Sequence, residues 1–359
     1  MTRKFNFGAG PATMPEAVLE EVQQELLDWK GLGLSIMEIS HRSPEFVEIA
    51  NQAESDFRDL LDINDNYAVL FLHGGATLQN AMIPLNLSPE GGTADYIDTG
   101  HWAKRSISEA KKYTKVNIAA SSEDRDFTYF PKQSSWNVSK NTSYLHITPN
   151  ETIGGLRFKD LKDLDVPIVA DYSSAILSEV IEVNKFSLIY GGAQKNIGPA
   201  GLGFAIIKKE LLGKAQSITP TMLNYSEMHE DKSMYNTPPT FAWYVAGKIF
   251  KWLKSMGGVS EMEKINNKKA KKIYSFIDQS DFYENKINKE DRSIMNIPFQ
   301  LNNEDLNSRF LEESRDAGLL ALKGHRSVGG MRASIYNAMP EEGVDALIDF
   351  MRTFEKERS

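Results

Sequence analysis

The chain contains no cysteine among its 359 residues. Disulfide bonds, thiolate metal sites and cysteine nucleophiles are therefore excluded. It also lacks any run of 18 apolar residues and any basic leader followed by an apolar stretch, so nothing predicts membrane insertion or export. The net charge of −8 disfavours nucleic acid and anionic membranes as main partners. Together these absences predict a cytoplasmic enzyme.

The chain is rich, by contrast, in short apolar runs bounded by turn residues and separated by helical or loop segments. The seven runs are Tyr67–Leu72, Ala94–Ile97, Val116–Ala119, Tyr144–Ile147, Val166–Ala170, Leu188–Tyr190 and Gly203–Ile207. This alternation predicts an α/β fold with a doubly wound sheet, in which ligands bind at the carboxyl ends of the strands.

Apolar residues at helical spacing predict amphipathic helices near Pro15–Trp29 and Pro44–Leu61, and a closing helix that begins at Pro340. After Phe241–Met256 the pattern changes to long amphipathic helices with a strand at Met295–Gln300. We therefore expect a domain boundary near residue 260.

With a separate N-terminal segment, the chain is expected to have three parts. An N-terminal segment (1–15) is expected to pack with a small C-terminal α+β domain (261–359), and a large domain (16–260) is expected to hold the sheet. The basic run Lys268–Lys272 predicts a solvated helix face.

The most informative segment is Tyr190–Gly203, because it places Lys195 in a glycine-rich turn directly after an apolar run. Burial there disfavours the ammonium ion, and the neutral amine can attack an aldehyde. Asp171 ends another apolar run, 24 positions earlier. Such a pair suits pyridoxal phosphate, with the carboxylate keeping the ring nitrogen protonated and the lysine holding the aldehyde carbon. A lysine in a turn is by itself more often structural, so the pair carries the hypothesis.

A second glycine turn, His73–Asn80, follows the first apolar run and opens a helical segment. Glycines let the backbone approach an anion, and a helix N-terminus offers free N–H groups. The turn is neither a Walker loop nor a dinucleotide fingerprint. It predicts a site for a cofactor phosphate, with an ordinary strand-to-helix turn as the alternative.

Basic side chains gather in three polar connecting segments, at His41–Arg42, His325–Arg326 and Arg332. Arginine pairs bidentately with carboxylate or phosphate, and histidine adds a donor. In an acidic protein these segments predict a pocket for an anionic substrate. An ordinary surface ion pair remains the alternative for each of them singly.

Nine segments resemble, in order, the phosphoserine aminotransferase family of the class V aminotransferases, and the match runs essentially from residue 4 to residue 354. They are FNFGAGPATMP, MEISHRSPEF, FLHGGATLQNAMIPLN, DTGHWAKRSISEAKKY, PNETIGG, VADYSSAILS, YGGAQKNIGPAGLG, MYNTPPTFAWY and GHRSVGGMRASIYNAMP. The resemblance implies the pyridoxal-phosphate-dependent transferase fold of type I, with a large, mostly parallel seven-stranded sheet, and a homodimer whose active sites are shared across the interface. It implies reversible transfer of the amino group from L-glutamate to 3-phosphohydroxypyruvate in serine biosynthesis. Action on the phosphorylated four-carbon analogue of pyridoxine biosynthesis is left open.

Carried over by position, the resemblance implies that Lys195 forms the Schiff base with pyridoxal phosphate and shuttles a proton, while Asp171 pairs with the ring nitrogen. Trp102 is expected to stack on the ring, and Thr152 to bind on the side of its phenolic oxygen. The phosphate is assigned to Ala76, Thr77 and Gln194, with Asn236 and Thr237 from the partner subunit. The substrate α-carboxylate is assigned to Arg332, and the substrate phosphate to His41, Arg42, His325 and Arg326. Without the resemblance, Trp102 could equally pack in the core, and Thr152 could cap a turn or helix.

Two positions depart from other members of the family. Ala9 stands where many have serine, and Ala76–Thr77 stands where others have Gly-Arg. The second change moves phosphate binding from a guanidinium group toward backbone N–H and hydroxyl donors, and neither change affects Asp171 or Lys195.

Other functions fit the sequence less well. A cysteine desulfurase is excluded by the missing thiol, and alanine–glyoxylate transamination does not explain so many anion donors. A nicotinamide-dependent dehydrogenase would need a dinucleotide fingerprint. A non-catalytic protein that binds a phosphorylated metabolite remains the alternative from another class, with Lys195 then structural.

Overall fold

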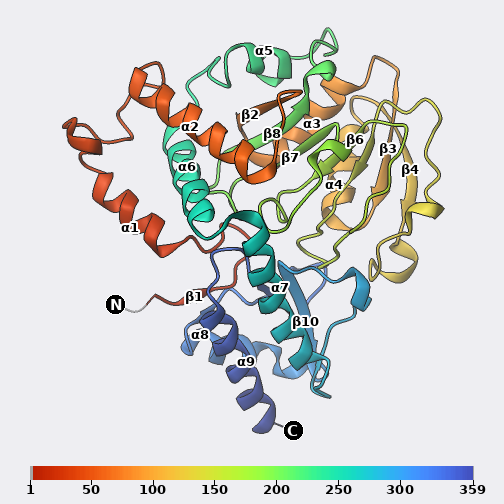
Figure 1. The fold of residues 1–359 in the computed structure, drawn as a ribbon. Helices are drawn as coiled ribbons and strands as arrows, with labels where there is room; N and C mark the ends of the chain where they lie inside the picture. Colours follow the sequence, from red (N-terminus) through yellow and green to blue (C-terminus); the bar gives the residue numbers. More distant parts are fainter. Residues whose placement is uncertain (1–2, 359) are drawn as a thin grey trace.

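In the computed structural model, which describes residues 3–358, the chain folds around one large sheet (Figure 1). Its strand order is β2 (Tyr67–His73), β8 (Leu202–Lys208), β7 (Leu188–Gly192), β6 (Ile168–Asp171), β5 (Leu145–Ile147), β3 (Thr93–Asp98) and β4 (Lys115–Ser121). Strand β8 is antiparallel to both of its neighbours, and the remaining pairs are parallel. All seven predicted strands and the mostly parallel sheet are therefore confirmed.

Except at the edge strand β4, both faces of the sheet are buried, which explains why most strands are nearly all apolar. In β2, Val69 and Phe71 belong to one core cluster, whereas Leu70 and Leu72 belong to another. The first face packs against α2 (Pro44–Leu61) and α6 (Thr240–Ser255), and the second packs against α3 (Gly75–Leu87) and α4 (His101–Ala110). A short helix, α5 (Tyr225–Glu230), packs beside β2 on the second face.

The first helix is shorter than predicted. Helix α1 spans Glu16–Glu25, and Trp29 lies in a separate 3-10 turn, Trp29–Gly31. The extended backbone of Asp28 breaks the helix, with φ of −146° and ψ of 95°. The indole of Trp29 is nevertheless buried, as its position in the apolar pattern required.

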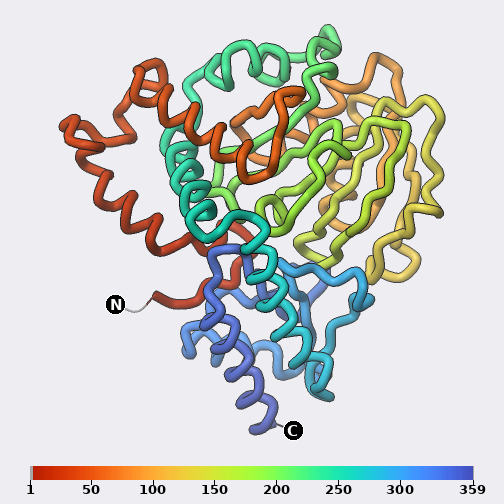
Figure 2. Tube along the Cα trace, in the orientation of Figure 1, coloured from red at the N-terminus to blue at the C-terminus, as the bar shows by residue number. Residues whose placement is uncertain are grey.

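The C-terminal part of the chain gathers below the large sheet (Figure 2). It contains the antiparallel strands β9 (Tyr283–Glu284), β10 (Asn296–Leu301) and β12 (Met331–Ser334), and the helices α7 (Gly258–Ile277), α8 (Asn307–Asp316) and α9 (Glu341–Lys356). The predicted strand after Met295 and the helix after Pro340 are confirmed. Arg332, expected in a connecting segment, lies in β12 because it pairs with Pro298 of β10.

The N-terminal segment joins this part of the molecule. Strand β1 (Phe5–Asn6) pairs in parallel with β11 (Leu319–Leu320), and Phe7 is fully buried among C-terminal residues. The predicted boundary near residue 260 falls inside α7, so the division into 1–15, 16–260 and 261–359 stays a prediction. Residues 1, 2 and 359 of that division lie outside the described residues.

The prediction of a solvated face at Lys268–Lys272 is wrong for one of its four lysines. The Lys269 side chain is fully buried, and its Nζ donates to the main-chain oxygens of Ile335, Tyr336 and Met339 at 3.1, 2.9 and 3.0 Å. Helical periodicity places Lys269 on the same face as the buried Met262 and Ile273. Lys268 and Lys271, by contrast, are exposed as predicted.

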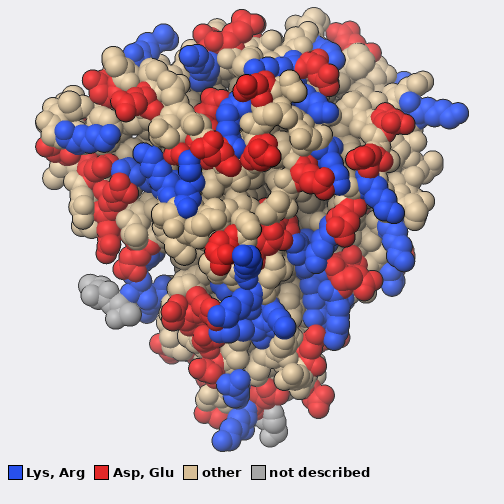
Figure 3. All heavy atoms as spheres, viewed as in Figure 1, with Lys and Arg blue, Asp and Glu red and all other residues tan. Residues whose placement is uncertain are grey.

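The surface seen in Figure 3 mixes lysine and arginine with aspartate and glutamate, which suits a chain with a net charge of −8. Among residues 3–358, no helix combines the length and the apolar character needed to cross a membrane.

Candidate active site

A cavity of about 430 Å³ opens where the carboxyl ends of β5 and β6 meet the turns that follow β2 and β7. This is the position at which doubly wound sheets bind their ligands. All seven cofactor residues predicted from this chain's own subunit line the cavity, namely Ala76, Thr77, Trp102, Thr152, Asp171, Gln194 and Lys195.

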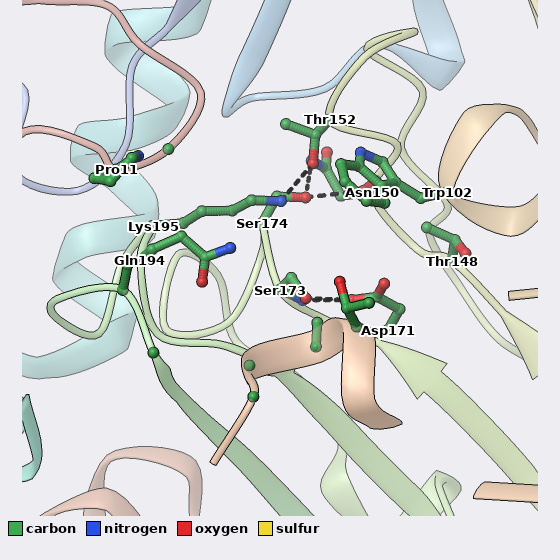
Figure 4. Close-up of a pocket in the computed structure, with 17 residues that line it drawn as sticks. Pro11, Trp102, Thr148, Asn150, Thr152, Asp171, Ser173, Ser174, Gln194 and Lys195 are labelled. Carbon is green, nitrogen blue, oxygen red and sulfur yellow. Dashed lines mark hydrogen bonds between the residues drawn. The ribbon is translucent and has the colours of Figure 1, made fainter. Parts of the chain in front are cut away.

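Lys195 and Asp171 reach this one cavity from different sides (Figure 4). Lys195 lies in the tight turn after β7, where its N–H donates to the oxygen of Ala193 at 2.7 Å. Its Nζ donates to Thr152 Oγ1 at 2.6 Å. The lysine is thus fixed at its backbone and at its tip.

Burial lowers the pKa of Lys195 to about 8. The charges of Asp171 and Glu151 oppose this fall, and the nearby Arg332 adds to it. At pH 7.5 about a quarter of the amine is then neutral, compared with about one part in a thousand for an exposed lysine. The site therefore supplies a nucleophilic and basic amine near neutral pH.

Asp171 is the last residue of β6 and is held by its own turn. Its Oδ1 accepts hydrogen bonds from the backbone N–H and the hydroxyl of Ser173, at 2.9 and 2.6 Å. Ser173 Oγ in turn accepts from the N–H of Gly192 on β7 at 3.2 Å. Within residues 3–358 Oδ2 makes no hydrogen bond, so it is available to a ligand in the cavity.

The turn after β2 forms an anion site. Gly74 caps α3 in a left-handed conformation, with φ of 76°, and no side chain caps the helix. The first-turn N–H groups, including those of Ala76 and Thr77, therefore have no partner within the helix. A Cβ at Gly203 would lie 3.1 Å from the backbone of Gly75, so β8 needs a glycine there to let this turn approach.

Trp102 lies in the first turn of α4 with its ring 5.7 Å from Lys195 Nζ. In the described part of the chain its buried Nε1 and the buried Oγ1 of Thr148 have no hydrogen-bond partner. Unpartnered polar atoms around a cavity indicate a ligand that supplies their partners. A flat apolar ring, an amine, a carboxylate and an anion turn fit pyridoxal phosphate.

The predicted substrate residues do not line the cavity within the one chain that the structure describes. Arg332 lies nearest, since its Nη1 donates to the main-chain oxygen of Thr152 at 3.4 Å. The ring of His325 lies 5.0 Å from that of His101, the residue before Trp102. Arg326 follows on the same exposed segment.

The residues expected from a partner subunit lie elsewhere. Asn236 and Thr237 are exposed in the segment between α5 and α6, and His41 and Arg42 precede α2. No member of these two pairs lines the cavity formed by residues 3–358. Their roles stay predictions.

Sequence reasoning missed several polar residues that follow β5 and β6. Asn150 and Ser174 line the cavity, and Asn150 Nδ2 donates to Ser174 Oγ at 2.7 Å and to Asn296 Oδ1 of β10 at 2.9 Å. Glu151 is fully buried next to them. These residues follow shortly after the apolar runs that form β5 and β6. The same pattern had pointed to Asp171, and it could have identified them too.

Comparison with known proteins agrees with this geometry. The profile of the Aminotransferase class-V family matches residues 4–347, so the chain belongs to the class-V aminotransferases. It is 58% identical to the phosphoserine aminotransferase of Hahella chejuensis over 98% of both chains, and 56% identical to that of Pseudomonas aeruginosa over 99% of both. Within the class, the chain is thus a member of the phosphoserine aminotransferase family.

Solved structures of the same family superpose closely. The phosphoserine aminotransferase of Bacillus circulans subsp. alkalophilus matches with a TM-score of 0.98 and 44% identity over 99% of each chain. The pyridoxal-phosphate-bound enzyme of Trichomonas vaginalis matches with a TM-score of 0.93 and 38% identity, over 98% of this chain and all of that one. The predicted type I fold is confirmed.

Proposed function

We propose that the protein is a phosphoserine aminotransferase that depends on pyridoxal phosphate. It transfers the amino group of L-glutamate to 3-phosphohydroxypyruvate, giving 2-oxoglutarate and O-phospho-L-serine in serine biosynthesis. The observation that carries this proposal is the amine of Lys195 and the carboxylate of Asp171 in one cavity beside Trp102 and the α3 turn. Family membership supports the choice of substrates.

Bound pyridoxal phosphate supplies an electron-withdrawing ring that stabilises the electron pair left when the substrate α-carbon loses its proton. The N–H groups at the start of α3 and the Thr77 hydroxyl hold the phosphate, with Gln194 beside them. Asp171 keeps the ring nitrogen protonated, because a fixed carboxylate favours the positive charge. Trp102 covers a face of the ring, and Thr152 binds on its phenolic-oxygen side.

Lys195 would hold the cofactor through its aldehyde carbon. Its amine lies at the cavity wall, where it would take the proton from the α-carbon of the substrate. Burial lowers the pKa of this amine, which favours the neutral form that such a base requires.

The substrates are bound through their negative charges. Arg332 takes the α-carboxylate that both amino-acid substrates share. His41, Arg42, His325 and Arg326 take the far anion, which is a carboxylate in glutamate and a phosphate in phosphoserine. Arginine and histidine can serve both, since each anion offers oxygen acceptors.

A homodimer in the cytoplasm completes this proposal. The exposed positions of Asn236 and Thr237 support their delivery to a partner's cavity. The segment between α1 and α2 also exposes large apolar side chains, at Leu27, Leu34 and Met37. A second copy of the chain would bury them. Sedimentation velocity should show a dimer, and a monomer would contradict this part of the proposal.

The direct test is cofactor capture followed by turnover. The purified protein should turn yellow with pyridoxal phosphate, and borohydride should attach the cofactor to the peptide that contains Lys195. Glutamate and 3-phosphohydroxypyruvate should then yield phosphoserine. A protein that stays colourless would favour the non-catalytic alternative.

The substrate-binding roles have their own test. Arg42→Ala and Arg326→Ala should each raise the KM for 3-phosphohydroxypyruvate by at least about tenfold, since each removes a charged hydrogen bond. An unchanged KM would show that these arginines do not contact the phosphate.

A further inference from the structure

Glu151 is a fully buried carboxylate that the roles above leave unused. Its Oε2 accepts from the N–H of Trp102 at 3.2 Å, and its Oε1 accepts from the N–H of Ala103 at 2.9 Å. Both donors belong to the first turn of α4, whose N-cap is Gly100 and which no side chain of its own caps. A carboxylate from a distant loop therefore caps this helix.

The cap is built into the local backbone. Gly100 has a φ of 141°, and a Cβ there would lie 3.3 Å from the carboxyl carbon of Glu151 and 3.4 and 3.5 Å from its two oxygens. Glycine leaves room for the carboxylate and also permits this backbone conformation.

The main chain of Glu151 closes the loop that carries Thr152. Its N–H donates to the oxygen of Leu156 at 2.9 Å, and its oxygen accepts from the N–H of Gly155 at 2.8 Å. Thr152 follows directly, with Lys195 on its hydroxyl and Arg332 on its carbonyl oxygen. One residue thus connects Trp102 with the groups that hold the lysine.

The charge of Glu151 also acts on the lysine. Asp171 and Glu151 raise the pKa of Lys195, and Arg332 lowers it. Burial raises the pKa of Glu151 itself to about 7, helped by Asp171 and Asp98 and opposed by the two N–H donors. Within residues 3–358 no lysine or arginine forms an ion pair with Glu151.

We propose that Glu151 is a positioning residue with two effects on the site. Its carboxylate fixes the start of α4, and hence the indole of Trp102, relative to Thr152. Its negative charge lies one residue from Thr152, whose hydroxyl binds Lys195 Nζ, and favours the charged form of that amine. The importance of Glu151 for catalysis rests on the proposed function. Its effects on the position of Trp102 and on the charge of Lys195 do not.

The test replaces the charge and keeps the shape, with Glu151→Gln. In the cofactor-free protein, the pH dependence of Lys195 labelling by an amine reagent, followed by mass spectrometry, gives the pKa of the amine. We expect its midpoint to fall by about 0.5 to 1 pH unit, since a nearby negative charge is lost. In the loaded enzyme, the visible circular-dichroism band of the cofactor should weaken, because Trp102 is no longer held.

Two further variants complete the design. Glu45→Gln is the matched control: Glu45 lies in the first turn of α2, is partly exposed, and follows a Ser43 cap. It should leave both measurements unchanged. Glu151→Asp retains the charge on a shorter side chain. It should restore most of the midpoint while the dichroism band stays weak, and that weakened band tests the positioning effect even if the glutamine variant does not fold.

The results separate the alternatives. A lower melting temperature with an unchanged Lys195 midpoint in Glu151→Gln would reduce the residue to a structural cap and overturn the proposal. If Glu151→Asp and Glu151→Gln shifted the midpoint of Lys195 labelling equally, the shift would not come from the charge, and the proposal would also be overturned. Because labelling requires no turnover, a shifted midpoint in a protein that makes no phosphoserine would refute the proposed function and leave this inference standing.

Discussion

Two buried lysines, Lys195 and Lys269, show how the same side chain serves different ends in one molecule. Burial lowers the pKa of both, to about 8 for Lys195 and about 7 for Lys269. Lys195 has one side-chain acceptor and lines a cavity. Lys269 has three main-chain acceptors, which match the three protons of an ammonium ion.

The difference lies in what surrounds the amine. Three carbonyl oxygens surround the nitrogen of Lys269 and accept its hydrogen bonds, so a neutral amine there would have no accessible lone pair. Around Lys195 one hydroxyl and an open cavity leave the neutral amine accessible. Burial alone therefore does not identify a reactive lysine, whereas the number of acceptors and access to a cavity do.

The largest expected effect comes from exchanging the reactive amine. Lys195→Met should lower turnover by at least about 10⁴-fold, since it removes both the nucleophile and the base. The free energy of unfolding of the cofactor-free protein should stay the same or rise, because methionine removes a buried amine that makes only one hydrogen bond, to Thr152. Chemical denaturation measures this free energy. A destabilisation as large as that expected for Lys269→Met would contradict the proposed difference between the two lysines.

The carboxylate that shares the cavity should come next. Asp171→Asn should lower turnover by about 10³-fold, because a fixed charge that stabilises the ring nitrogen is lost. A cofactor analogue methylated at the ring nitrogen carries a permanent positive charge and should restore part of the rate. Absence of any rescue would assign Asp171 a different role.

The matching exchange at the other lysine should affect stability. Lys269→Met should lower the free energy of unfolding by about 3 kcal/mol, because three buried carbonyl oxygens lose their donor. Turnover per folded molecule should be retained, as measured on protein titrated for bound cofactor. A catalytic defect as large as that of Lys195→Met would contradict the division of roles.

The smallest expected effect concerns pH. Cofactor capture by the cofactor-free protein requires the neutral amine of Lys195, so its rate should rise about tenfold per unit below pH 8 and level off above it. Stopped-flow absorbance measures this rate. A rate that keeps rising to pH 10 would place the pKa near that of an exposed lysine.

Much of the fold could be predicted, because each apolar run of the large sheet is bounded by turn residues. Asp171 and Lys195 could be predicted for a related reason, since a polar side chain directly after a buried strand lies at the ligand edge. Lys269 was missed because it lies in a run of lysines whose other members are at least partly exposed. Only its position around the helix axis places it on the buried face. Glu151 was missed because its partners lie 48 and 49 residues away.

The N-terminal segment has a practical consequence for handling the protein. After pairing with β11, it runs past the cavity: Ala9 accepts from the Tyr336 hydroxyl at 2.9 Å, Gly10 and Pro11 line the cavity, and Ala12 donates to Gln194 at 2.9 Å. Proteolytic trimming of about a dozen residues would therefore remove part of the cavity wall and uncover the edge of β11. Purification tags are better fused after α9, which ends at the far tip of the molecule (Figure 1).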